Sequence, residues 1–461
     1  MKNIDIKNKI FVNRTLNMNN IKLIGFDMDY TLVTYNVPEF EAKTYAIIKK
    51  KLINDYLYPK EINDFVFDPN FIIRGLVIDT ETGNFLKVNR YGFVRTASHG
   101  TSFFNFEELK SKYGVYSIDL TDSRYNIVHT LFSKAEGCLF AQLVDYFDKK
   151  EHSPKYKKIF DDVKRCLNNA HMEQELKGDV VSHPEKYLIP DRRIVDALIK
   201  FKKFGKKLAL ITNSDYNYSN KVMNYCFEKF INSSWQKIFD IIVVAANKPS
   251  FFKDSNMFLK VDPKTGLLSN FYGSLEWNGI YQGGNANYLE KNFNIDPSEI
   301  LYLGDHILGD VVTLKETIGW RTGLVVQELE EEVPILEKTQ EIHKIIAKKM
   351  LEKERLEDIS LGYREKLWLK DNAKVNRQKW DEIKEKMMKL DEELRDLITQ
   401  SQQGFNPYWG EVMRAGNEVS RFAALVERYA CIYMSGIANL YYYSPYKYFR
   451  SQRRLLAHDP K

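Results

Sequence analysis

The stretch Ile21-Lys-Leu-Ile-Gly-Phe-Asp-Met-Asp-Tyr-Thr31 decides the fold. It opens with a short apolar run, which indicates a buried strand, and the carboxylates of Asp27 and Asp29 follow at once. Two carboxylates at this spacing after a strand can divide catalytic work, one as a nucleophile and the other in proton transfer. A plain acidic turn is the alternative. An EF-hand calcium loop starting at Asp27 is excluded, because it would need Gly and Glu where Leu32 and Pro38 stand.

Three later apolar runs repeat this pattern, at Leu208–Ile211, Ile241–Ala245 and Ile300–Leu303. Each is followed by polar residues, and segments of helical periodicity, such as residues 194–204, lie between them. Apolar runs that alternate with helices predict an α/β fold with a doubly wound parallel sheet. Ligands of such sheets bind at the carboxyl ends of the strands, so the four polar clusters should converge on one place.

The clusters carry different chemistry. The hydroxyl of Thr212 suits a phosphate oxygen, although Thr also caps helices. Lys248 could neutralise a phosphate, whereas most lysines are plain surface charges. Asp305 and Asp310, bracketed by glycines, suit a hard cation with oxygen ligands, and an aspartate helix cap is their alternative. His306 between them is expected to be structural, because Mg²⁺ prefers oxygen ligands.

Composition limits the class of protein. The chain has 461 residues, 44% hydrophobic and 28% charged, and a formal charge of +6, which fits a folded protein and does not favour a nucleic-acid binder. No apolar run approaches the ~18 residues of a membrane span, and no secretory leader is recognisable, so neither a membrane nor secretion is expected. The four cysteines show no metal-ligand spacing, and a reducing compartment, the cytoplasm, is predicted: Cys138, Cys166, Cys226 and Cys431.

The sequence suggests four regions. Residues 1–35 hold the first part of the core with the Asp27 motif, and residues 36–180 form a long insert. Residues 181–330 complete the core, and residues 331–461 form a C-terminal helical region that packs on the core or on a partner subunit. Between residues 327 and 400 the chain is rich in Glu, Lys and Leu, which indicates solvated helices, for which an antiparallel pair is one arrangement.

The order Asp-x-Asp, Thr, Lys, Gly-Asp…Asp resembles that of the haloacid dehalogenase-like superfamily of phosphotransferases. Longer segments are similar to the cytosolic purine 5′-nucleotidases that prefer IMP and GMP. These segments are Phe11-Val-Asn-Arg-Thr-Leu16, Gly25-Phe-Asp-Met-Asp-Tyr-Thr-Leu32, Thr212-Asn-Ser-Asp-Tyr216, Lys248-Pro249, Gly304-Asp-His-Ile-Leu-Gly-Asp310, Gly319-Trp-Arg-Thr322 and Leu440-Tyr-Tyr-Tyr443. The resemblance implies a Rossmann-like core, a cap formed by the insert, and hydrolysis of a purine nucleoside 5′-monophosphate.

The resemblance also implies roles for the strand-end residues. Asp27 would attack the phosphate and form an aspartyl-phosphate, and Asp29 would act as acid and base. Thr212 and Lys248 would hold the phosphoryl oxygens, with support from the neighbours Asn213 and Ser214. Mg²⁺ would be bound by Asp27, the backbone carbonyl of Asp29 and Asp305, with Asp310 acting behind them or through water.

In the family, the cap recognises the purine. The matching positions here are Phe132, Ser133, Lys164, Asn168, His171 and Lys177, with Phe132 as the ring that would stack on the base. The family commonly has Asn at Ser133, Arg at Lys164 and Asp at Asn168. The change at Asn168 alters the hydrogen bonds offered to the purine edge, so base preference is open while the strand-end chemistry is unaffected.

Two other interpretations remain. One is a phosphatase of the same superfamily with a different phosphomonoester substrate. The other is a catalytically silent scaffold, against which the intact set of strand-end residues argues. A homo-oligomer is expected from the resemblance.

Overall fold

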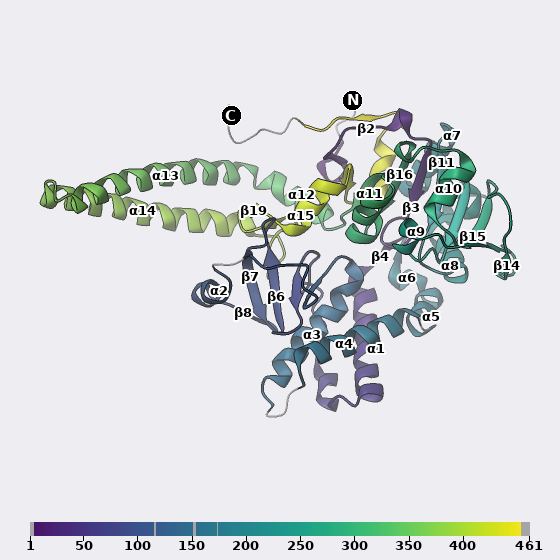
Figure 1. Ribbon diagram of the computed structural model, residues 1–461, viewed down its shortest axis with the longest axis horizontal. Coiled ribbons are helices and arrows are strands. Elements are labelled where there is room, and N and C mark those ends of the chain that lie inside the picture. The colour runs from purple at the N-terminus through teal and green to yellow at the C-terminus, as the bar shows by residue number, and fades with distance from the viewer. Residues whose placement is uncertain (1–3, 115–116, 151–153, 173, 453–461) are drawn as a thin grey trace. The chain divides into compact units, whose positions relative to one another are not determined.

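The computed structural model describes residues 4–114, 117–150, 154–172 and 174–452, and it contains a ten-stranded sheet (Figure 1). The order of its strands is β1 (Phe11–Val12), β20 (Ile432–Met434), β17 (Arg321–Val325), β16 (Ile300–Gly304), β3 (Leu23–Phe26), β11 (Lys207–Ile211), β12 (Ile241–Val244), β15 (Gly279–Gly283), β13 (Phe258–Val261) and β14 (Leu268–Asn270). From β20 to β15 all neighbours pair in parallel, whereas the pairs β1–β20, β15–β13 and β13–β14 are antiparallel. The predicted α/β fold with a mostly parallel sheet is confirmed.

Both faces of this sheet are covered, as expected for a doubly wound fold. Along β3, Ile24 and Phe26 belong to one buried cluster and Leu23 belongs to another. Leu208 and Ala209 of β11 divide between the same two clusters. The alternation follows from the strand geometry, in which successive side chains point to opposite faces. Helices that contribute to these two clusters are α7 (Arg192–Lys203), α8 (Tyr216–Phe227), α9 (Ser250–Lys253), α10 (Ala286–Phe293) and α11 (Thr313–Thr317), while α15 (Arg421–Tyr429) packs against residues Ile307–Val312 after β16.

Gly25 permits a close approach within the sheet. A Cβ atom at this position would lie 2.7 Å from the Tyr302 ring on the adjacent strand β16. The ring of Tyr302 therefore lies across β3 just before the strand ends at Phe26. This fully buried tyrosine becomes part of the site described below.

The insert lies between two short strands that pair with each other, β4 (Thr34–Tyr35) and β10 (Leu188–Ile189). It contains a five-stranded antiparallel sheet and a group of helices (Figure 1). The strands are β5 (Val77–Asp79), β6 (Asn84–Val88), β7 (Val94–His99), β8 (Ser102–Phe103) and β9 (Tyr125–Ile127). The helices are α1 (Val37–Tyr56), α2 (Phe106–Tyr113), α3 (Lys134–Phe147), α4 (Tyr156–Met172), α5 (Gln174–Ser182) and α6 (Pro184–Tyr187).

The C-terminal region, expected as one helical part from 331 to 461, divides in two. Residues 330–410 form a separate compact unit with α13 (Gln340–Trp368) and α14 (Ala373–Gln402), preceded by α12 (Leu329–Lys338). In Figure 1, α13 and α14 run side by side in opposite directions, and an ion pair of 2.6 Å joins Lys353 to Asp391. The following residues instead belong with the core, because β20 inserts between β1 and β17. Among the described residues, no helix combines the length and apolar character needed to cross a bilayer.

Glu41 ties two cap helices together. It lies on α1, and its Oε2 accepts a hydrogen bond of 2.8 Å from the backbone N–H of Ala135 in the first turn of α3. The side chain is fully buried, and burial raises the pKa of its carboxyl from 4.5 to about 8, although the Ala135 N–H acts in the opposite direction. The cap therefore contains a carboxyl group that binds its proton more tightly in the folded protein than in the unfolded chain.

Glu41→Gln should reduce the pH dependence of stability. The folded protein binds this proton more tightly than the unfolded chain, so the contribution is complete below pH 4.5 and is lost as pH rises toward about 8. The variant, which retains the acceptor oxygen, should therefore gain stability relative to the wild type between pH 5.5 and pH 8, on the order of a few kcal/mol. The measurement is thermal or denaturant unfolding at both pH values.

Glu39→Gln is the matched control, because it removes the same charge from an exposed position of α1. The role assigned to Glu41 would be contradicted if the difference in free energy of unfolding between wild type and Glu41→Gln were the same at pH 5.5 and pH 8.

Candidate active site

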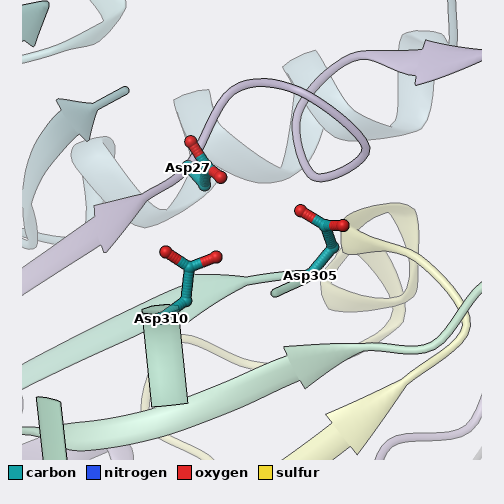
Figure 2. Close-up of side chains that lie close together, drawn as sticks. All are labelled: Asp27, Asp305 and Asp310. Atoms are coloured by element: carbon teal, nitrogen blue, oxygen red, sulfur yellow. The ribbon is translucent and has the colours of Figure 1, made fainter. Parts of the chain in front are cut away.

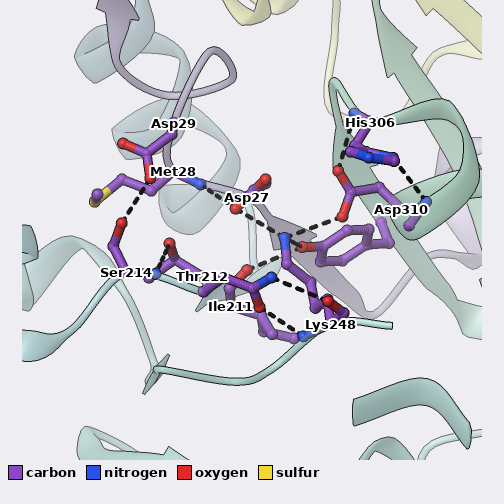
Figure 3. A network of polar contacts seen from close by, with 12 residues as sticks. Asp27, Met28, Asp29, Ile211, Thr212, Ser214, Lys248, His306 and Asp310 are labelled. Carbon is purple, nitrogen blue, oxygen red and sulfur yellow. Dashed lines mark hydrogen bonds and ion pairs between the residues drawn. The ribbon is translucent and has the colours of Figure 1, made fainter. Parts of the chain in front are cut away.

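The polar residues at the strand ends come together around one ammonium group. Lys248, which follows β12, places its Nζ 2.8 Å from Oδ1 of Asp27 and 3.0 Å from Oδ1 of Asp310 (Figure 3). The same Nζ donates to the hydroxyl of Tyr302 over 2.9 Å, and that hydroxyl donates to the Ile211 carbonyl. Residues from β3, β11, β12 and β16 thus meet at the carboxyl ends of their strands, as parallel pairing requires.

Lys248 is charged in this setting. Its side chain is only 4% exposed, and burial alone would lower its pKa. The carboxylates of Asp27 and Asp310 outweigh burial and raise the pKa of Lys248 well above its ordinary value. The group is therefore a fixed cation that can neutralise developing negative charge.

Asp27 sits at the edge of the buried region with a defined orientation. Its N–H donates to the Leu303 carbonyl over 2.9 Å, and its Oδ1 accepts from the Met28 N–H over 2.7 Å. Burial raises the pKa of the Asp27 carboxyl to about 7, while Lys248 acts in the opposite direction. A desolvated carboxylate held by one cation is chemically suited to nucleophilic attack.

Three carboxylates form a group that fits a hard cation. One carboxylate oxygen each from Asp27, Asp305 and Asp310 lies within 4.8 Å of the others (Figure 2). Oδ2 of Asp305 is buried and has no hydrogen-bond partner within the described part of the chain. Burial, followed by the Asp27 and Asp310 charges, raises the pKa of Asp305 well above its usual value. An all-oxygen, anionic donor set with an unpaired buried oxygen suits Mg²⁺.

Asp29 lies outside that group and has its own partners. Tyr35 donates its hydroxyl to Oδ1 over 2.6 Å, and Ser214 donates its hydroxyl to Oδ2 over 2.8 Å. Burial raises the pKa of Asp29, and these two hydrogen bonds partly oppose the shift. The side chain is held apart from the candidate cation site, which leaves it available for proton transfer.

The residues after β11 serve different partners. Thr212 Oγ1 accepts the Ser214 N–H over 3.1 Å, and Ser214 holds Asp29 as described. The side chain of Asn213, predicted to support the phosphate or a water molecule, bonds the backbone of Lys248 at both polar groups, accepting from the N–H over 2.6 Å and donating to the carbonyl over 3.0 Å. Asn213 thereby fixes the backbone that carries Lys248.

Phe132 belongs to an aromatic cluster that reaches the acid end of the site. Its ring centroid lies 4.5 Å from that of Tyr30, 5.5 Å from Phe40 and 5.3 Å from His171. The ring of Phe132 is half-buried. Nε2 of His171 is buried without a partner in the described part of the chain, and burial lowers the pKa of this ring to about 4. A neutral imidazole therefore stands beside Phe132.

Other predicted cap positions lie on α4 and just before α3. Lys164, Asn168 and His171 lie on one face of α4, because they are spaced four and three residues apart. Asn168 is exposed. Ser133 lies just before α3. Burial raises the pKa of the Glu136 carboxyl to about 7, and Ser133 partly opposes this effect.

Lys177 lies on the core side of the cap. Its ammonium pairs with Asp215 at 3.0 Å, and Asp215 caps the start of α8. The same ammonium lies 5.1 Å from the centre of the Tyr218 ring. The Tyr218 hydroxyl, in turn, is 2.9 Å from that of Tyr35, so Lys177 is linked through two tyrosines to Asp29.

Three site residues were not found from the sequence. Tyr302 contacts Lys248 from inside a strand, and Tyr35 reaches Asp29 from β4. Arg74 contacts the Asp305 backbone from the insert. Gly25 of the Ile21–Thr31 stretch makes room for the Tyr302 ring, but a single glycine is too common to predict such a contact.

Two solved structures show a distant similarity to part of this chain. A predicted phosphoglycolate phosphatase from Haemophilus somnus is 14% identical, with a TM-score of 0.30 over 67% of this chain and 86% of its own. CbbY from Rhodobacter sphaeroides, in complex with phosphate, is 14% identical, with a TM-score of 0.27 over 66% and 86%. The α/β fold of this chain is shown by the strand order of its own ten-stranded sheet.

The amino-acid sequence resembles known proteins over nearly its whole length. A 5′-nucleotidase domain-containing protein of Dictyostelium discoideum is 28% identical over 466 residues, which cover 98% of this chain and 75% of that protein. The model of the 5′ nucleotidase family matches residues 10–461. This chain therefore belongs to the 5′ nucleotidase family and is a 5′-nucleotidase, a phosphoric monoester hydrolase.

Proposed function

We propose that the protein is a Mg²⁺-dependent 5′-nucleotidase that hydrolyses purine nucleoside 5′-monophosphates, with the 6-oxopurine nucleotides IMP and GMP preferred. The observation that carries the chemistry is the buried Lys248 ammonium between Asp27 and Asp310, beside Asp305. This arrangement offers a nucleophile, a cation for the phosphoryl oxygens and a set of metal ligands within one small volume.

In the first half of the proposed reaction, a carboxylate oxygen of Asp27 attacks phosphorus. The bond from phosphorus to the ribose 5′-oxygen breaks, and Asp29 gives its proton to that oxygen. In the second half, Asp29 takes a proton from water while the water oxygen attacks the phosphorus and releases Asp27. Tyr35 and Ser214 hold the Asp29 carboxylate in place for both transfers.

Lys248 and Thr212 are proposed to bind the phosphoryl oxygens, Lys248 through its fixed charge and Thr212 through its hydroxyl. The residues proposed to hold Mg²⁺ are Asp27, Asp305, Asp310 and the backbone carbonyl of Asp29. When bound there, the ion would supply positive charge that screens the negative phosphate, so that the anionic Asp27 can approach it. The unpaired buried oxygen of Asp305 supports this assignment.

Recognition of the base is assigned to the cap. Phe132 is proposed to stack on the purine, because its half-buried ring lies against Tyr30, which follows Asp29 in the chain. Ser133, Lys164, Asn168, His171 and Lys177 are proposed as the polar groups around the nucleotide. A panel of purine and pyrimidine nucleoside monophosphates, with sugar monophosphates beside them, tests this base preference.

We also propose a cytoplasmic location and a homo-oligomer. The four cysteines, Cys138, Cys166, Cys226 and Cys431, are buried free thiols, which supports a reducing compartment. Light scattering of the purified chain measures the oligomeric state directly.

Asp27→Asn should abolish turnover, because it removes the nucleophile and a metal ligand together. The expected loss of kcat is on the order of 10⁴-fold or more. Asp240→Asn is the control, since Asp240 is also buried but lies before β12, where it accepts the Leu208 N–H at the opposite end of the strands. Substantial turnover by a well-folded Asp27→Asn preparation free of wild-type enzyme would reject the nucleophile.

Asp29→Asn should slow hydrolysis of a nucleoside monophosphate much more than phosphoenzyme formation from an activated aryl phosphate, whose leaving group needs no proton. Rapid-quench measurement of the phosphoenzyme with both substrates tests this. If the phosphoenzyme-forming step slowed equally for the two substrates, Asp29 would not be the acid for the leaving group.

Phe132→Ala should raise KM for IMP and GMP while hydrolysis of a small aryl phosphate stays nearly unchanged. A stacked base contributes about 1–3 kcal/mol, so the rise in KM should be about 5- to 150-fold. Steady-state kinetics with both substrates, beside a pyrimidine nucleotide, measure the effect.

Phe65→Ala is the matched control, because Phe65 is another half-buried cap phenylalanine whose ring packs on Tyr146. Equal losses on nucleotide and aryl phosphate would show that Phe132 serves only to pack the cap.

Asn168→Asp should shift selectivity among purine nucleotides, because it changes the hydrogen bonds offered to the base. An unchanged order of kcat/KM among purine nucleotides would remove Asn168 from the base site.

A further inference from the structure

Arg74 has no role in the chemistry proposed above, yet it is among the most buried charged groups of the protein. Its side chain has no exposed area. Its Nη1 donates to the carbonyl of Asp305 over 3.1 Å and to that of Val325 over 3.2 Å. Its Nε donates to Oε1 of Glu328 over 2.8 Å, and its Nη2 pairs with Oε2 of the same carboxylate.

These acceptors come from two neighbouring strands of the core. Asp305 directly follows β16, and Val325 is the last residue of β17. A single side chain from the insert therefore joins both strand ends to Glu328. Burying a guanidinium is costly unless its hydrogens are satisfied, and here a carboxylate and two carbonyls satisfy them. Only the planar, forked donor set of arginine matches all three acceptors.

The backbone directly after Arg74 is also constrained. Gly75 has a φ of +86°, and a Cβ atom there would lie 2.6 Å from the Cβ of Phe422. Its N–H donates to the Val128 carbonyl over 2.8 Å. The Arg74 guanidinium itself lies 5.5 Å from the centre of the Phe422 ring. The segment that presents Arg74 is thus pressed against α15 and is well placed to act as a fixed support.

Asp305 depends on such support. Its Oδ2 has no protein partner among the described residues, so side-chain hydrogen bonds do not account for the orientation of the carboxylate. The Arg74 contact holds the backbone of the same residue. A residue that orients a metal ligand in this way typically changes metal affinity or activity by about 10- to 100-fold when it is removed.

We propose that Arg74 is a positioning residue for the metal site: by holding the Asp305 backbone, it sets the geometry with which Asp305 binds Mg²⁺. This inference rests on the Mg²⁺ site proposed above. It also makes the affinity of the core for its metal dependent on a residue of the cap.

Isothermal titration of the full-length chain with Mg²⁺ tests the proposal, with Asp305→Asn as the reference for loss of the site. Arg74→Gln should weaken Mg²⁺ binding by about 10- to 100-fold and raise the Mg²⁺ concentration for half-maximal activity to match. Arg74→Lys should recover part of the affinity. Glu328→Gln should have a smaller effect, because the two carbonyl contacts remain.

Arg124→Gln is the matched control. Arg124 makes a similar two-pronged pair with the buried Asp79 inside the cap. Its removal should lower the melting temperature without changing the dissociation constant for Mg²⁺.

Each result bears on the proposal. Wild-type protein that binds no Mg²⁺ would overturn both the metal site and this inference. Wild-type affinity in Arg74→Gln, or an equal loss in Arg124→Gln, would overturn the inference alone and leave the metal site standing. If Arg74→Gln does not fold, unchanged Mg²⁺ affinity in both Arg74→Lys and Glu328→Gln overturns it.

Discussion

The contact of the Lys248 ammonium with Asp27 and Asp310 is the interaction on which the site depends. Asp27, Asp305 and Asp310 crowd their carboxylates into a buried volume, and like charges at that distance repel strongly. One ammonium held among them offsets part of the repulsion. The surroundings serve this contact, since Asn213 fixes the Lys248 backbone and Tyr302 accepts from its Nζ. Even Gly25 belongs to this arrangement, because only a residue without a Cβ leaves room for the Tyr302 ring.

The parallel sheet and the convergence of the strand-end residues could be predicted from the sequence for a physical reason. Each apolar run and the polar residues after it are local features, and parallel pairing brings the ends of such strands to one edge. Arg74 and Tyr302 could not be found in this way. Arg74 is 231 positions from Asp305, and Tyr302 is 54 from Lys248, so no local pattern records either contact. Asn213 was placed in the site, but its partner depends on the fold of the Lys248 loop.

The cap is connected to the chemistry through aromatic rings. Tyr30 directly follows Asp29 in the chain and contacts Phe132, whose other neighbours are Phe40 and His171. Tyr35 contacts the same group of rings and donates to Asp29. Phe132 is therefore only one ring contact away from Tyr35, which donates to the residue proposed as the acid. In the proposed function, recognition of the base and protonation of the leaving group would use neighbouring side chains.

The position of β20 has a consequence for how the chain is made. This strand lies between β1 and β17, and among the described residues the sheet neighbour of β1 is a segment more than 400 residues later in the chain. During synthesis the strands from β3 to β17 can pair as they emerge, whereas Phe11 and Val12 must wait until residue 434 has left the ribosome. Such a long-range closure is slow, and an unpaired strand edge is open to association in the meantime. The parallel centre of the sheet can therefore form before β20 is synthesised, whereas the edge of β17 stays unpaired until β20 is available.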